Sequence, residues 1–241
     1  MTRRPQSTRR QRVEEMERQI VDAALDAFSI HGFENARVAD IARAAGVAEG
    51  TVYLYFRGKD ALFDAVQRRF YARLTREAQA GVARLAGAQP RLAFLAEHWL
   101  SAVAPAWKIF ARLTYQIGFI EEYRSSDAYR MHHGYTEVFD HVAREGATSG
   151  ELREDLAPSM MRAMFYGGLG YACRAALTKG VPVAEIPAAT AGPVVDAFLA
   201  GLGRAPAARE AGDDDAAALR EAAARLEQAA ARLEGALARQ A

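Results

Sequence analysis

The sequence predicts an all-α protein with a small N-terminal head and a larger helical body. Apolar residues recur three and four positions apart along most of the chain, which is the period of an amphipathic helix. Prolines and glycines separate these periodic segments, and the alternating pattern of half-exposed strands is scarce. With 241 residues, 51% of them hydrophobic and 25% charged, the chain has the length and composition of a folded globular protein.

The helices follow one another with recognisable starts and stops. The spacing of Ile20, Ala24 and Phe28 predicts the first helix, and Gly32 supplies the positive φ that commonly ends one. Proline suits the first turn of a helix, so Pro90 and Pro158 mark two later starts. Further helices are predicted approximately over residues 38–45, 49–55, 59–84, 90–103, 106–123, 127–145, 158–179 and 187–202.

Charge is placed unevenly along a chain whose formal net charge is only +1. A molecule so nearly neutral attracts a polyanion weakly as a whole, so any such affinity has to come from a local cluster. The basic cluster lies at the N-terminus, where these arginines precede the first acidic residue, Glu14: Arg3, Arg4, Arg9, Arg10 and Arg12.

The stretch 38–56, VADIARAAGVAEGTVYLYF, has the pattern of a helix-turn-helix. Two short crossing helices need a small residue where they touch and, at the turn, a residue that tolerates positive φ. Ala42 and Gly46 meet these two requirements. Apolar residues then fall in register for a shared core: Ile41, Ala45, Val47, Val52 and Tyr55.

The second helix of such a unit lies in the major groove of DNA, with its N-terminal residues facing base edges and phosphates. Threonine and tyrosine hydroxyls can hydrogen-bond there, a glycine lets the backbone come close, and basic side chains beside a helix start pair with phosphate. The alternative for the hydroxyl-bearing residues is ordinary packing and capping. The predicted DNA contacts are Arg37, Gly50, Thr51, Tyr53, Tyr55 and Lys59.

Over residues 20–63 the chain resembles the TetR family of transcriptional regulators. The runs that carry the resemblance are Gly32-Phe33, Ile41-Ala42, Ala45-Gly46-Val47, Gly50-Thr51-Val52-Tyr53, Tyr55-Phe56 and Lys59. The resemblance implies a TetR-like fold, an Ω-shaped all-helical homodimer with a DNA-binding head and a variable effector-binding body. It also implies that Thr51, Tyr53, Tyr55 and Lys59 contact operator DNA, whereas Leu54 and Phe56 pack. One departure is Arg37, which stands before the helix at 38 where the family often has a capping Ser or Thr.

We expect the chain to divide into five parts. These are a basic N-terminal arm (1–12), a helix-turn-helix DNA-binding domain (13–60), an effector-binding and dimerisation domain (61–203), a linker (204–212) and a heptad-repeat helix (213–241). The repeat places Leu219, Leu226 and Leu233 on one stripe. Three heptads with alanine at alternate seam positions make a marginal coiled coil, so pairing and a solvated helix both stay open.

The body contains many aromatic residues and a few polar ones, the mixture of a largely apolar ligand site and also of any helical core. The candidates for effector contact are Trp99, Trp107, Phe110, Arg112, Tyr115, Phe119, Tyr123 and His133. The GTVYLYF run and the helix at 163–177 are similar to TetR-family regulators that respond to fatty acyl-CoA. That similarity implies a hydrophobic effector whose thioester or phosphate end meets a basic residue such as Arg112, Arg124 or Arg130.

The residues leave three other possibilities to consider: a metal site, a helical enzyme and an interaction protein. His133, Glu137 and His141 share a helical stripe and could hold a transition metal, but exposed or core histidines are commoner, so no metal site is predicted. A helical enzyme is the main alternative to a regulator, and an interaction protein built on the heptads is another. The sequence lacks a GxSxG turn, a CxxC pair and a glycine-rich phosphate loop, so we expect neither an enzyme nor a cofactor.

The partners expected are double-stranded operator DNA, a small hydrophobic effector and a second copy of the chain. Small residues in the helices near 158–202 permit the close helix approach of a homodimer interface. A single cysteine, Cys173, gives no sign of an oxidising compartment, and no uncharged run approaches the length of a membrane span. We therefore expect a cytoplasmic repressor that releases a palindromic operator when its effector binds, without contact to a membrane.

Overall fold

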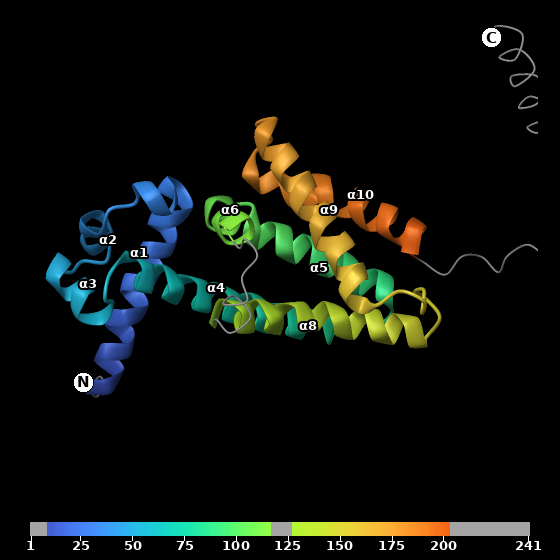
Figure 1. The fold of residues 1–241 in the computed structure, drawn as a ribbon, viewed down its shortest axis with the longest axis horizontal. Helices are drawn as coiled ribbons and strands as arrows, with labels where there is room; N and C mark the ends of the chain where they lie inside the picture. Colours follow the sequence, from blue (N-terminus) through green and yellow to red (C-terminus); the bar gives the residue numbers. More distant parts are fainter. Residues whose placement is uncertain (1–8, 117–126, 203–241) are drawn as a thin grey trace, which may run out of the picture. The chain divides into compact units, whose positions relative to one another are not determined.

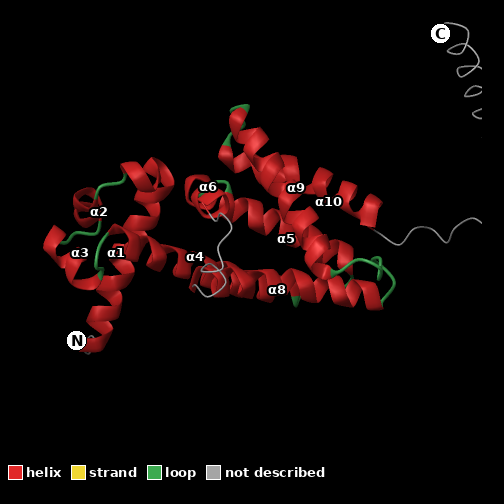
Figure 2. Cartoon of the chain, in the orientation of Figure 1, coloured by secondary structure: helices red, strands yellow, loops and turns green. Residues whose placement is uncertain are grey.

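The computed structural model describes residues 9–116 and 127–202, and its regular elements in this part of the chain are all helices (Figure 2). The chain divides into two compact units, 1–203 and 204–241, and the first of them holds every described residue. The heptad repeat, the linker and the start of the basic arm lie outside the described residues.

The head consists of α1 (Arg9–Asn35), α2 (Val38–Ala44) and α3 (Glu49–Tyr55), shown at the left of Figure 1. Its core is apolar and fully buried, and it contains Ile20, Ala24, Phe28, Ile41, Val52 and Phe56. Gly32 (φ 76°) bends the chain at the end of α1, and Gly46 (φ 70°) makes the turn between α2 and α3. Both conformations are ones that glycine adopts without a steric penalty.

Two boundaries in the head refine the sequence predictions. Helix α1 begins at Arg9, so residues 9–12 of the expected arm are helical. Arginine, glutamine and glutamate favour helices, and Arg10 Nε lies 2.8 Å from Glu14 Oε1 one turn away, which extends the helix toward the N-terminus. Helix α2 begins at Val38 even though its cap residue, Arg37, makes no side-chain capping bond.

Helix α4 (Lys59–Val82) leads from the head into the body and runs beside α8 (Asp127–Thr148) (Figure 1). The body also contains α5 (Ala88–Val103), α6 (Trp107–Gln116) and α9 (Pro158–Thr178). A short 3-10 helix (Val183–Glu185) precedes α10 (Ile186–Leu202), which packs on α5 and α9. The predicted helices therefore all exist, with ends within a few residues of those expected wherever the end is described.

The segment Val183–Gly201 is the one stretch of the described chain that is long and apolar enough to span a membrane by length and composition. It is not an uncharged run, because Glu185 and Asp196 lie within it. Within the fold, Ile186 and Phe198 are buried, and the Phe198 ring meets the Phe165 ring with 5.2 Å between centroids. Only 28% of the segment is buried, so one side packs on the body and the other stays uncovered.

Candidate functional site

Helix α3 presents one face outward while the opposite face holds it to the head. Val52 and Phe56, four residues apart, are buried. Leu54, which lies between them, therefore points to the other side and is 84% exposed. The expectation that Leu54 packs was wrong for this reason, whereas the expectation that Phe56 packs is confirmed.

The hydroxyl-bearing residues of α3 differ in exposure. Tyr53 is 51% exposed, and Gly50 is fully on the surface with no atom within 4 Å of where a Cβ would lie. Thr51 and Tyr55 are half-buried, and Tyr55 packs on the core of the head. The first turn of α3 thus offers a bare backbone and the hydroxyls of Thr51 and Tyr53 to a partner on the outer side.

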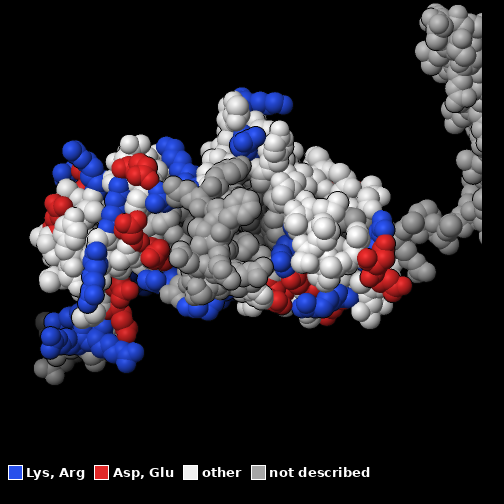
Figure 3. All heavy atoms as spheres, viewed as in Figure 1, with Lys and Arg blue, Asp and Glu red and all other residues white. Residues whose placement is uncertain are grey.

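Positive charge gathers at the start of α1, at the lower left of Figure 3. Arg9, Arg10 and Arg12 are exposed there. Arg37 is exposed at the start of α2. The head thus carries exposed arginines at the start of α1 and directly before α2.

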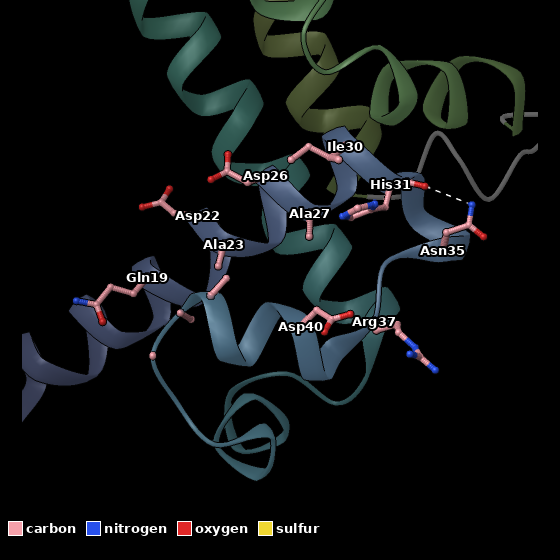
Figure 4. Close-up of a pocket in the computed structure, with 13 residues that line it drawn as sticks. Gln19, Asp22, Ala23, Asp26, Ala27, Ile30, His31, Asn35, Arg37 and Asp40 are labelled. Carbon is pink, nitrogen blue, oxygen red and sulfur yellow. Dashed lines mark hydrogen bonds between the residues drawn. The ribbon is translucent and has the colours of Figure 1, made fainter.

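A groove of about 800 Å³ lies between α1 and α2 and is lined by acidic side chains as well as by Arg37 (Figure 4). Three carboxylates border it, those of Asp22, Asp26 and Asp40, and the Arg37 guanidinium extends away from them. Asp22 Oδ1 lies 2.8 Å from Arg69 Nη2, and Asp40 Oδ1 accepts from Arg43 at 2.9 Å. Two of the three carboxylates are therefore balanced by arginines, so the groove by itself neither attracts nor repels a phosphate strongly.

Lys59 has intramolecular partners. Its Nζ donates to the backbone carbonyl of Glu34 at 3.0 Å and lies 4.7 Å from the centroid of the Phe33 ring. An ammonium has three donors, so these contacts leave capacity for a phosphate. In this position the Lys59 side chain also stabilises the end of α1.

Arg112, predicted as an effector contact, contacts the same end of α1. Its guanidinium carbon lies 3.8 Å from the centroid of the Phe33 ring, and the side chain forms an ion pair with Glu34. Lys108, one turn earlier on α6, donates to the carbonyl of Ile30. Cations at the C-terminal end of a helix satisfy its last carbonyls and complement its dipole. We call Ile30, Phe33, Glu34, Lys59, Lys108 and Arg112 the junction cluster.

Three of the predicted effector contacts do lie together in the body. The Trp99 ring on α5 is 5.1 Å from that of Phe110 on α6, and the Trp107 ring is 5.4 Å from Phe110. The series continues from Trp99 to Tyr166 and from Tyr166 to Tyr135, each pair 5.7 Å between centroids. We call these five residues the aromatic chain, and it links α6 through α5 to α9 and α8.

The other predicted effector contacts are not part of this chain of rings as described. His133 is exposed on α8, with Nε2 3.7 Å from Glu137 Oε1. The side chain of Tyr115 and the residues Phe119 and Tyr123 lie outside the described part of the structure, as does Arg124. Among the described residues, no group of three His, Cys, Asp or Glu side chains could hold a metal ion.

The sequence did not single out the polar atoms inside the body. The hydroxyls of Tyr135 and Tyr166 and Oδ1 of Asp140 are buried without a hydrogen-bond partner in the described part of the chain. Burial raises the pKa of both tyrosines well above the usual value, so both hydroxyls are protonated. Because tyrosine serves equally in cores and in sites, the sequence held no signal that these two differ from the other aromatics.

Comparisons with known proteins connect both parts of the molecule to one family. A profile described as "Bacterial regulatory proteins, tetR family" matches residues 20–66. A fatty acid metabolism regulator protein of Bacillus subtilis is 28% identical over 151 residues, which cover 62% of this chain and 77% of that protein. The transcriptional regulator BetI of Klebsiella pneumoniae is 42% identical over 57 residues, 24% of this chain and only 29% of its own length.

Solved structures extend the likeness to the fold. A fatty acid degradation regulator from Bacillus halodurans has 26% identity and a TM-score of 0.65, covering 77% of this chain and 98% of the other. A Bacillus subtilis transcriptional regulator in complex with stearoyl-CoA has 24% identity and a TM-score of 0.66, covering 76% and 98%. Matches of this length reach beyond the head into the body, and the chain belongs to the TetR family of bacterial transcriptional regulators.

Proposed function

We propose that the chain is a homodimeric transcriptional repressor that holds a palindromic operator through its heads and releases it when a hydrophobic effector enters its bodies. The observation that carries the DNA-binding part is the outward face of α3. Buried Val52 and Phe56 fix the helix, so that Gly50, Tyr53 and Leu54 face away from the head. A helix held in this way fits the major groove.

The DNA contacts proposed are Arg37, Gly50, Thr51, Tyr53, Tyr55 and Lys59. The exposed Tyr53 hydroxyl and the Thr51 hydroxyl suit phosphates or base edges, and Arg37 suits a phosphate. Tyr55 and Lys59 combine this role with packing on the head and on α1. The arginines at the start of α1 add a salt-dependent attraction to the backbone or to a neighbouring minor groove.

The dimer is proposed to form through residues 158–202. On α9, the exposed side chains of Met160, Met164 and Tyr171 fall on one stripe, with the exposed Gly167 and Gly168 between them. Large apolar side chains rarely share an exposed stripe unless a partner covers them. Helix α10 packs on α9, so a second copy could cover this stripe together with the uncovered side of α10, and two heads could then read a palindrome.

The effector is proposed to be a fatty acyl-CoA or a similar amphiphile. One relative is a fatty acid metabolism regulator, and a structural neighbour was solved with stearoyl-CoA. The aromatic chain gives an apolar lining of the kind that an acyl chain needs. The effector contacts proposed from the sequence that agree with this lining are Trp99, Trp107 and Phe110.

Release is proposed to pass through the junction cluster. Helix α6 carries Trp107 and Phe110 of the aromatic chain. It also carries Lys108 and Arg112, which contact the end of α1. A ligand that moves α6 therefore acts on the orientation of the head. Differential binding of effector and DNA to two such arrangements suffices for regulation, with a coupling of about 1 to 3 kcal/mol.

The remaining assignments are part of the same proposal. The protein works in the cytoplasm, where its DNA lies, without contact to a membrane. The domain limits are those expected from the sequence, except that residues 9–12 belong to α1, and the segment 213–241 adds to dimer stability or contacts a partner without defining the activity.

Selection of binding sites from a pool of random duplexes, followed by fluorescence anisotropy at about 50 and 200 mM salt, tests the DNA-binding part. The expected result is enrichment of one palindrome and binding that weakens steeply at the higher salt concentration. Recovery of unrelated sequences, bound no better than the starting pool, would contradict the proposal.

A further inference from the structure

We propose that the hydroxyls of Tyr135 on α8 and Tyr166 on α9 together bind the carbonyl oxygen of the effector, where its apolar chain meets its polar head. This inference rests on the proposed function and adds to it the part of the ligand that the body recognises by hydrogen bonding. It assigns a role to two residues that the sequence did not single out.

The burial of these two hydroxyls is energetically unfavourable. Tyr135 is 2% exposed, the hydroxyl of Tyr166 is equally hidden, and neither makes a hydrogen bond of normal geometry in the described residues, although the two hydroxyls are close enough to affect each other's pKa. A buried polar group without a partner costs about 1 to 3 kcal/mol. Two such groups with rings 5.7 Å apart are a pair, and a ligand that accepts both hydrogen bonds would remove the cost of both.

The second argument is their position between apolar and charged surroundings. On one side the aromatic chain continues from Tyr166 through Trp99 to Phe110. The charges of Arg162 and Asp140, which form an ion pair, also act on the Tyr166 hydroxyl. The Arg162 side chain is 26% exposed, so the ion pair marks a place where the interior reaches the surface. An amphiphile has the same order of parts: apolar chain, carbonyl, polar head.

The third argument concerns the kind of carbonyl. Burial keeps both phenols protonated, so they act as donors toward an acceptor. Within the described residues, Arg162 is already balanced by Asp140, so its charge is not free to hold a carboxylate. A neutral carbonyl with two lone pairs fits two phenol donors. The structure therefore favours an acyl thioester or ester over a free fatty acid.

The experiment compares stearoyl-CoA with S-octadecyl-CoA, the thioether that lacks only the carbonyl, by calorimetry on the full-length wild-type protein. Each hydrogen bond contributes about 1 kcal/mol, so the two phenols should make the thioester bind about tenfold or more tightly than the thioether. The double variant Tyr135→Phe/Tyr166→Phe should bind both ligands equally. Its melting temperature should not fall, because each substitution removes a buried hydroxyl without a partner.

Thr148→Val is the control, since it removes an exposed hydroxyl from α8, the helix that carries Tyr135, outside the proposed dimer surface, and should leave the preference unchanged. Equal affinity of the wild type for thioester and thioether would overturn the inference, whether or not the double variant folds. So would a double variant that keeps the preference. If neither ligand binds while the operator does, both this site and the acyl-CoA effector are contradicted, and the DNA-binding part of the proposal still stands.

Discussion

The head and the body of this molecule are both helical bundles, yet they differ in how far neighbours in sequence are neighbours in space. In the head, the turn, the outward face and half of the named core residues lie within the 19 residues from Val38 to Phe56, and the rest of that core comes from α1. In the body, the aromatic chain joins rings from four helices spread between Trp99 and Tyr166. A local unit can be recognised from spacing alone, whereas a distributed one depends on how helices pack.

The same difference separates the roles of similar residues. Arg112 and Trp107 are five positions apart on α6, but Arg112 contacts α1 and Trp107 contacts the aromatic chain. Helix α6 therefore belongs to both regions. In the proposed mechanism, the connection between the DNA-binding head and the effector site therefore runs through this short helix, whose two faces contact different parts of the molecule.

The largest effect is expected from Tyr53→Ala in the head. The side chain is half exposed, so its loss should leave the free energy of unfolding within about 0.5 kcal/mol of wild type. Loss of a contact to DNA should weaken operator binding by about 1 to 3 kcal/mol, about 5-fold to 150-fold. Anisotropy titrations measure this, with Gln79→Ala, an exposed position on α4 outside the head and the proposed dimer surface, as control. Unchanged operator affinity in Tyr53→Ala would remove α3 from the interface.

Two glycines in the body should show that packing decides whether a change to alanine raises or lowers the free energy of unfolding. A Cβ on Gly81 of α4 would collide with the Phe94 ring of α5, whereas a Cβ on Gly134 of α8 meets nothing within 4 Å. Gly81→Ala should destabilise by about 1 to 3 kcal/mol through overpacking. Gly134→Ala should stabilise by up to about 1 kcal/mol through helix propensity. Denaturant titrations would contradict this prediction if both substitutions changed the free energy of unfolding in the same direction.

A smaller effect is expected from Arg112→Ala, which tests whether α6 connects the two regions. Loss of the contacts with Phe33 and Glu34 should cost about 0.5 to 1 kcal/mol of stability. The dissociation constant for stearoyl-CoA should stay within about twofold, while the factor by which the ligand weakens operator binding should fall. Arg153→Ala, which removes an exposed ion pair in the loop before α9, is the control. A tenfold loss of ligand affinity would instead place Arg112 in the effector site.

The smallest effect concerns Cys173, the one cysteine of the chain. It is fully buried in α9, and burial raises the pKa of its thiol to about 11. At pH 8 only about one molecule in a thousand then carries the reactive thiolate. A chromogenic disulfide reagent should therefore leave native protein unmodified and react fully after unfolding. Rapid reaction of the native protein would reopen a redox role.

The sequence was sufficient for the features that depend on local geometry. Gly46 marked the turn, the spacing of Ile41 and Val52 marked the core of the head, and helical periodicity located the helices of the body. It failed at Leu54, because an apolar residue was assigned to packing although the helical period places it opposite Val52 and Phe56.

Other features could not be predicted because they arise only when distant helices meet. Arg112 was grouped with the aromatic residues around it in sequence, but the open carbonyl end of α1 and the Phe33 ring attract its cation. His133 was grouped in the same way and lies on the exposed side of α8. Tyr135 and Tyr166 become notable only because their hydroxyls lie inside the body without partners.

The most direct test of the account is whether operator and effector binding are coupled with equal strength in both directions. Anisotropy gives the factor by which saturating stearoyl-CoA weakens the binding of the selected operator, and calorimetry gives the factor by which saturating operator weakens the binding of stearoyl-CoA. The account predicts that the two factors are equal and lie between about 5 and 150, because linkage makes the coupling reciprocal. Independent binding of the two ligands, with both factors near one, would contradict it.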